Sequence, residues 1–312
     1  MWSLPRAPCL VMYHLGAMRF HWPLVLMYHA VVPAQPGWSN VDLGVVYQED
    51  LERQLRYLKR WFGVLHPEEY AEHLARGRPL PRRAALVTVD DGYQNLLDYA
   101  LPVARAVNVV PLAFVSTGHL DATQWLWFAR VCASRLLGGP DLRPLFGLLG
   151  TMTLAQIEAV LLERRAPRRE DGSPLTRLLY DGSRAEDLAR HARSGALCLG
   201  GHTVSHPNLP REAPEFQRRE IEENRRELER LSGAPVRLFA YPSGDIDANV
   251  ARCLRDAGYH GAFSILPAPR SFPVDLRRYH IPRTGIYTSG RIAFALKCAG
   301  VDYWRWKLGL VG

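Results

Sequence analysis

The sequence has no long hydrophobic run. None of its apolar stretches approaches the roughly 18 consecutive residues that a membrane-spanning helix needs, although 47% of its 312 residues are hydrophobic and 22% are charged. This composition is typical of a globular protein and excludes an integral protein with helical spans. The first residues also lack an apolar core followed by a small-residue cleavage site, so we expect no secretory signal and a cytoplasmic location.

Cysteine is scarce. The five cysteines are far apart, odd in number and mostly surrounded by apolar residues: Cys9, Cys132, Cys198, Cys253 and Cys298. This spacing argues against a disulfide framework and against a zinc knuckle. We therefore expect reduced, largely buried thiols.

No recognisable nucleic-acid-binding motif accompanies the basic charge. The formal net charge of +8 comes mostly from arginine that is spread along the chain, with the densest block at 163–170, "ERRAPRRE". Scattered arginine is typical of a solvated surface, so we expect no nucleic-acid partner.

The C-terminal segment mixes two tryptophans with basic residues: Trp304, Trp306, Lys297, Arg305 and Lys307. This composition is compatible with peripheral contact at an anionic membrane surface, here the inner membrane face. The alternative is that the segment packs on the rest of the protein.

Short apolar runs alternate with segments of helical periodicity. The expected strands are 24–29, 84–90, 109–116, 196–201, 236–242 and 261–266. The expected helices are 48–60, 93–107, 125–137, 153–165, 184–194, 211–232 and 246–257. Parallel strands need crossover helices, so this alternation predicts an α/β fold with a mainly parallel sheet or barrel. Active residues are then expected at the carboxyl ends of the strands.

The pattern weakens between about 120 and 183, where aromatic residues, proline and arginine are frequent. We interpret this segment as a mainly helical insertion in one barrel domain. Its aromatic residues Trp125, Trp127 and Phe128 are expected to pack, with a sugar-binding platform as the alternative.

The expected organisation has three parts: an N-terminal extension over 1–21, a barrel over 22–290 and a C-terminal tail over 291–312. "CLVMYH" at 9–14 nearly duplicates "LVLMYH" at 24–29. The sequence therefore leaves open whether Met1 or Met18 is the true start.

Two adjacent carboxylates follow an apolar run in "LVTVDDGYQN", residues 86–95. Asp90 and Asp91 are expected at the end of a strand, because Gly92 permits a tight turn directly after them. Neighbouring carboxylates repel each other, and a divalent cation would keep both ionised.

Two histidines lie four residues apart in "LGGHTVSHPNL", residues 199–209. If a helical turn begins after Gly201, His202 and His206 share one face. One carboxylate from 90–91 would complete a set of two His and one Asp, with ligand bonds of about 2.0–2.2 Å and an open position for water. The alternative is a pair of histidines at the surface or hydrogen-bonded in the core.

Together these stretches resemble the polysaccharide deacetylase superfamily, the NodB-homology sugar de-N-acetylases of carbohydrate esterase family four. The family signatures "TFDDG" and "H(S/T)xxSH" correspond to 88–92 and 202–206, and "HPNL" at 206–209 is also typical. The resemblance covers roughly 22–118 and 184–290. It implies a distorted (β/α) barrel and a metal-dependent hydrolase that removes N-acetyl groups from an N-acetylated sugar in a polysaccharide, oligosaccharide or glycolipid.

The resemblance also implies roles for matching residues. Asp90 corresponds to the general base that deprotonates the attacking water. The ligands of a divalent metal, Zn²⁺ first and Co²⁺ or Mn²⁺ as alternatives, correspond to Asp91, His202 and His206. The physics agrees, because zinc lowers the pKa of bound water to about 7 and polarises an amide carbonyl.

The third family segment, usually Arg-Pro-Pro-Tyr-Gly, is Ala-Tyr-Pro-Ser-Gly at 240–244. Its turn is expected to offer the backbone N–H of Ser243 to the oxyanion. The leading Arg is absent, and an ordinary Pro-Gly turn is the alternative.

A general acid is still needed, and the C-terminal Leu-x-His that supplies it in many family members is not evident. "LVLMYHAVVP" resembles the N-terminal "MYH" segment of the subgroup that includes exopolysaccharide poly-N-acetylglucosamine deacetylases. His29 is therefore the expected acid, with His280 second and His14 third. In that subgroup a late Arg, matching Arg283, is expected to pair with the base and replace the missing one.

The alternative function is a catalytically impaired metal- and carbohydrate-binding module of the same fold, motivated by the altered third segment. An intact Asp90 argues against it, since a binding module has no need of the base. The sugar and the oligomeric state stay open.

Overall fold

The computed structural model describes residues 24–34, 45–265, 271–287 and 290–300. Eight strands follow one another in a parallel path: β10 (Ile281–Pro282), β9 (Gly261–Ser264), β8 (Leu238–Ala240), β7 (Cys198–Gly201), β6 (Leu112–Val115), β5 (Ala84–Val89), β1 (Leu24–Tyr28) and β11 (Thr284–Gly285). Outside this path, β4 (Gly63–Val64) pairs with the start of β5, and β2 (Val31–Val32) pairs with β3 (Val46–Tyr47).

The two ends of the path are joined by the chain itself. β10 pairs with β9, β11 pairs with β1, and only Arg283 separates β10 from β11. The backbone N–H of Arg283 donates to the carbonyl of Ser264 at 3.0 Å, which extends the pairing with β9 by one residue. The sheet therefore forms a nearly closed parallel barrel, as the sequence predicted.

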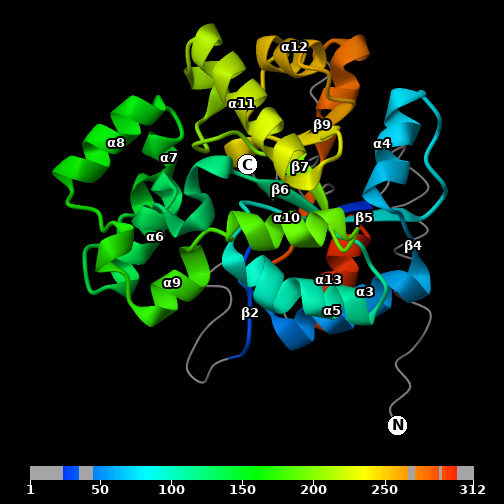
Figure 1. Ribbon diagram of the computed structural model, residues 1–312, viewed down its shortest axis with the longest axis horizontal. Helices are drawn as coiled ribbons and strands as arrows, with labels where there is room; N and C mark the ends of the chain where they lie inside the picture. Colours follow the sequence, from blue (N-terminus) through cyan, green and yellow to red (C-terminus); the bar gives the residue numbers. More distant parts are fainter. Residues whose placement is uncertain (1–23, 35–44, 266–270, 288–289, 301–312) are drawn as a thin grey trace.

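Helices surround the barrel (Figure 1). Those outside the expected insertion are α3 (Gln48–Trp61), α4 (Pro67–Ala75), α5 (Leu101–Ala106), α10 (Ala185–Arg193), α11 (Pro214–Ser232), α12 (Ala248–Asp256) and α13 (Arg291–Cys298). α11 turns Ile221, Leu228 and Leu231 to the core and ends at Gly233, whose φ of 70° provides a left-handed cap.

The segment 120–183 contains α6 (Trp127–Leu136), α7 (Phe146–Leu149), α8 (Leu154–Glu163) and α9 (Pro174–Tyr180). These helices gather at one side of the barrel, at the left of Figure 1. α8 begins at a capping box between Thr153 and Gln156. Trp125 and Trp127 are buried in this region and Phe128 is half-buried, so the first two pack as expected.

The first part of the expected C-terminal tail belongs to the helical layer. In α13, Phe294 is buried in the core that lies between strands and helices, and its ring contacts Tyr57 of α3 edge-on at 5.7 Å. Trp304 and Trp306 lie outside the described residues, as do Cys9 and His14.

The six expected strands all form, each shortened by one to four residues. The sequence analysis missed the remaining strands because each has only two residues, too few to show a period. It also missed α4, α7, α9 and α13.

Alternation along the strands divides the core in two. Val25, Leu86, Phe114 and Ile281 belong to a cluster inside the barrel. Their neighbours in the strands, such as Leu26 and Val87, belong to a larger cluster between the sheet and the helices. The inward positions continue past the strand ends and determine which side chains reach the barrel mouth.

A close approach inside the barrel gives a stability prediction. A Cβ on Gly200 of β7 would lie 2.5 Å from the buried ring of Phe114. Gly200→Ala should therefore lower the free energy of unfolding by about 1–3 kcal/mol, because a packed ring must shift. Gly63→Ala is the matched control, since its Cβ would meet nothing within 4 Å. Equal stability of the two variants in urea unfolding would contradict this packing.

Candidate active site

A pocket of about 230 Å³ opens at the carboxyl ends of the strands. Every site residue expected from the sequence in the described part of the chain lines it, except His280: His29, Asp90, Asp91, His202, His206, Ser243 and Arg283. This agrees with the general placement of active sites in parallel α/β proteins.

Inward register brings three of these side chains together. Thr88 and Asp90 continue the inward positions of β5 beyond Leu86, and His29 continues those of β1 beyond Val25. Arg283 stands two residues after the inward Ile281. Side chains two apart on a strand point to the same face, so all three strands deliver polar groups to one mouth.

Asp90 and Arg283 form a buried, two-pronged ion pair. One guanidinium nitrogen lies 2.6 Å from Oδ1 of Asp90 and the other lies 2.7 Å from Oδ2. The first nitrogen also donates to the Thr88 hydroxyl at 3.2 Å, and the guanidinium lies over the Phe114 ring at 5.3 Å. The planar guanidinium thus fixes both oxygens of the carboxylate.

Asp91 leaves the strand through a left-handed turn. Its φ is 74° and that of Gly92 is 84°. A Cβ on Gly92 would lie 2.7 Å from Cγ1 of Val115, so the turn requires glycine for both conformation and space. The carbonyl of Asp91 accepts from the backbone N–H of Ser116 at 3.1 Å and from His119 at 2.8 Å. These bonds hold Asp91 in an orientation different from that of Asp90.

The two histidines meet without the expected helical turn. Residues 202–208 form no helix, and Thr203 and His206 have φ values of 65° and 58°. The helical turn considered for this segment does not form, because Thr203 and His206 adopt left-handed conformations. The Thr203 hydroxyl accepts from the His206 N–H at 3.0 Å and closes this loop.

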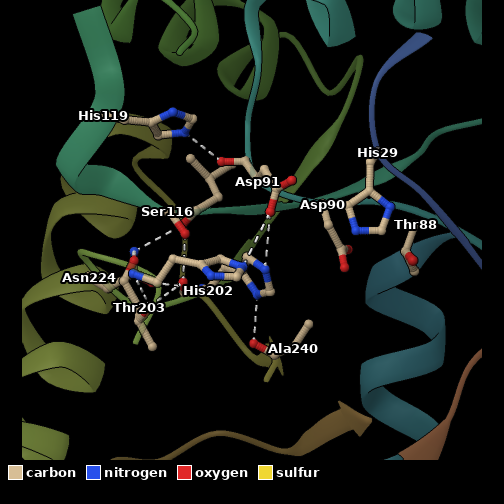
Figure 2. A network of polar contacts seen from close by, with 12 residues as sticks. His29, Thr88, Asp90, Asp91, Ser116, His119, His202, Thr203, Asn224 and Ala240 are labelled. Carbon is tan, nitrogen blue, oxygen red and sulfur yellow. Dashed lines mark hydrogen bonds and ion pairs between the residues drawn. The ribbon is translucent and has the colours of Figure 1, made fainter. Parts of the chain in front are cut away.

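Asp91, His202 and His206 nevertheless form a compact set. Each offers a ligand atom, and these atoms all lie within 4.8 Å of one another. Nε2 of His202 and Nε2 of His206 lie 3.5 Å and 3.6 Å from Oδ1 of Asp91. Figure 2 shows the His202 ring directed at this carboxylate, with Asp90 and His29 beside it.

The donor atoms of this set fit a divalent cation. Both carboxylate oxygens of Asp91 are buried and have no hydrogen-bond partner among the described residues. Nδ1 of His202 donates to the Ala240 carbonyl at 2.7 Å, which leaves the lone pair on the Nε2 that faces Asp91. Two nitrogens and one carboxylate with an open side are typical of a catalytic zinc site.

Burial and neighbouring side chains shift the pKa of His206 and of Asp91. Burial lowers the pKa of His206 to about 3 and nearby His202 acts in the same direction, so the imidazole is neutral at pH 7. Burial opposes ionisation of Asp91, but the adjacent His202, His29 and His206 outweigh it and hold the pKa of this carboxyl below its usual range. A neutral imidazole and an ionised carboxylate are the forms that bind metals.

The histidines considered as acids lie in different places. His29 is half-buried at the mouth, where its ring stacks on Tyr287 with centroids 5.8 Å apart. His280 is buried against Phe272, with centroids 4.8 Å apart, and precedes β10 at the amino end of the barrel strands. The geometry therefore favours His29 over His280.

Ser243 lies in a tight turn at the pocket wall. Its φ is 59°, and the N–H of Gly244 donates to the Tyr241 carbonyl at 3.1 Å. The turn follows β8 directly, so the third segment reaches the same mouth as the other two.

The sequence analysis expected Trp127 and Phe128 to pack and gave an aromatic surface at the site only as the alternative. Trp127 and Phe128 of α6 and Phe146 of α7 line the pocket. The Phe128 ring lies 4.5 Å from that of His206, and the indole N–H of Trp127 donates to the His206 carbonyl at 2.8 Å. Two adjacent aromatic residues at the start of an expected helix were the available signal, but nothing in their spacing indicated which surface they face.

Solved structures with the same fold come from several bacteria. The deacetylase PplD of Streptococcus pyogenes, in complex with acetate, has a TM-score of 0.57 at 16% identity over 85% of this chain and 92% of that chain. IcaB from Ammonifex degensii has a TM-score of 0.57 at 19% identity, over 90% of this chain and 96% of that chain. A polysaccharide deacetylase from Bacillus cereus has a TM-score of 0.59 at 18% identity, over 88% of this chain and 68% of that chain.

At such low identity these structures show a shared fold. No curated protein matches the sequence. The family model for polysaccharide deacetylase matches residues 77–262, more than half of the chain. This range includes both the aspartate pair and the two histidines. With the barrel and the site geometry in agreement, the chain belongs to the polysaccharide deacetylase family.

Proposed function

We propose that the protein is a metal-dependent hydrolase that removes the N-acetyl group from an acetamido sugar. The observation that carries the proposal is the pairing of a buried Asp91, His202 and His206 set with the separate Asp90–Arg283 pair in one pocket. A metal set alone would fit a binding module. A second carboxylate, held close to the set and not part of it, fits a base.

Asp91, His202 and His206 would hold the cation. When bound, Zn²⁺, Co²⁺ or Mn²⁺ supplies Lewis acidity, which polarises the amide carbonyl and acidifies water. Water then attacks the carbonyl carbon, the C–N bond breaks, and acetate and a free sugar amine are released.

Asp90 accepts the proton of the attacking water in this scheme. Arg283 fixes the carboxylate through both oxygens, and each oxygen keeps a further lone pair for the proton. The same Arg283 stands in for the Arg that the third family segment lacks. The N–H of Ser243 donates to the oxygen on which negative charge develops.

His29 donates a proton to the departing amine, because a C–N bond breaks poorly while its nitrogen leaves as an amide anion. A general acid on β1 and a late Arg on the closing strand support placing the chain in the subgroup with the N-terminal "MYH" segment. The catalytically impaired binding module stays the alternative, and turnover decides between the two.

The substrate is proposed only as a class. Acetate release after chelation and addition of zinc, cobalt or manganese should be measured on N-acetylated oligosaccharides, lipid-linked sugars and nucleotide sugars. Metal-dependent release from at least one of them is expected. Zinc binding without release from any of them would favour the binding module.

The two aspartates should separate by role. Asp90→Asn should abolish most turnover and leave the zinc content nearly unchanged, because Asp90 lies outside the ligand set. Asp91→Asn should lower both, because it replaces an anionic ligand. Metal content by mass spectrometry and acetate release are measured on the same preparations. Equal metal loss in the two variants would reverse the assignment of base and ligand.

His29→Ala should lower kcat by about 10²–10⁴-fold with zinc binding preserved, the usual cost of losing a general acid. His280→Ala is the comparison, since His280 lies away from the pocket. Its effect on kcat per folded protein should be small. A large loss in His280→Ala together with a small one in His29→Ala would transfer the role to His280.

A further inference from the structure

The loop that carries both histidines is strained. Thr203 and His206 have left-handed backbones, with φ values of 65° and 58°, and neither is glycine. Such conformations are unfavourable for residues that carry a Cβ, and they persist where surrounding contacts determine them. The loop contains no helix or strand between the two histidines, so contacts from outside add to the internal Thr203–His206 bond in maintaining its shape.

α11 supplies those contacts through Glu220. Oε2 of Glu220 accepts from the backbone N–H groups of Val204 and Ser205, both at 2.8 Å, and Oε1 accepts from the Ser205 hydroxyl at 2.7 Å. All three donors come from the two central residues of the loop. The side chain is only 5% exposed, which is rare for a carboxylate without such partners.

Asn224, one turn further along α11, holds the first half of the same loop. Its side-chain oxygen accepts from the N–H of His202 at 3.0 Å, and its amide nitrogen donates to the carbonyls of Thr203 and Val115. Figure 2 shows Asn224 close to Thr203, to the left of the His202 ring. α11 therefore binds the loop through Glu220 and Asn224, and neither residue belongs to the candidate ligand set.

We infer that Glu220 is a positioning residue for the metal site: it sets the separation and direction of His202 and His206 by binding the loop between them. The inference rests on the proposed function, because it assumes that the two imidazoles share a cation. A carboxylate suits this task, since it accepts all three hydrogen bonds and offers no competing donor.

The test measures zinc affinity of the metal-free protein by competition with a chromophoric chelator. Glu220→Ala should raise the Kd for zinc by about 10–100-fold, the usual effect of removing a group that orients a metal ligand. Glu220→Gln should recover most of the affinity, because its amide oxygen can still accept from both N–H groups. Glu223→Ala is the matched control, since Glu223 is exposed on the same helix.

A purely structural role predicts a different result. The unfolding temperature of metal-free Glu220→Ala would then be lower than that of the wild type, while its Kd for zinc would equal that of Glu223→Ala. This outcome would overturn the inference. If Glu220→Ala does not fold, Glu220→Asp is used in its place. The shorter side chain keeps the negative charge but moves the carboxylate away from the N–H groups of Val204 and Ser205. A zinc Kd within twofold of wild type for that variant would equally overturn the inference.

Failure of the proposed function is distinguishable. A wild-type protein that binds no zinc would contradict the proposed metal site, and with it the positioning role of Glu220. A wild-type protein that binds zinc but releases no acetate would leave the positioning role intact and testable by Kd alone.

Discussion

The ion pair between Asp90 and Arg283 connects the strands that close the barrel to the candidate base in the pocket. Arg283 stands between β10 and β11, where the two ends of the sheet path meet, and its guanidinium binds both oxygens of Asp90 at the end of β5. A buried charge of either sign is costly without its partner, by about 3–5 kcal/mol. The closing strand and the candidate base therefore depend on each other.

Simple rules predicted much of this arrangement. Six strands and a mainly parallel sheet followed from the alternation of strands with helices, and Asp90 and Asp91 were expected at the end of a strand. The family resemblance of 88–92 and 202–206 pointed to Asp91, His202 and His206 as the candidate ligand set. These features could be predicted because each strand and each motif consists of residues that are close in sequence.

Other features depend on contacts that the sequence does not reveal. The histidines meet through left-handed residues, and these conformations are held by Glu220 and Asn224 from another element. The two-residue strands beside Arg283 are too short for a period. The aromatic lining of the pocket comes from the insertion, and its contact with His206 links residues about 80 positions apart. Tertiary packing decided each of these.

The central claim is that Asp91, His202 and His206 share one divalent ion beside a separate base. Anomalous diffraction at the zinc edge, from crystals grown with one equivalent of zinc, tests it most directly. The account predicts a single peak about 2.0–2.2 Å from the two Nε2 atoms and a carboxylate oxygen of Asp91, with Asp90 still bound to Arg283. A peak ligated by Asp90, or the absence of any peak at this set, would contradict it.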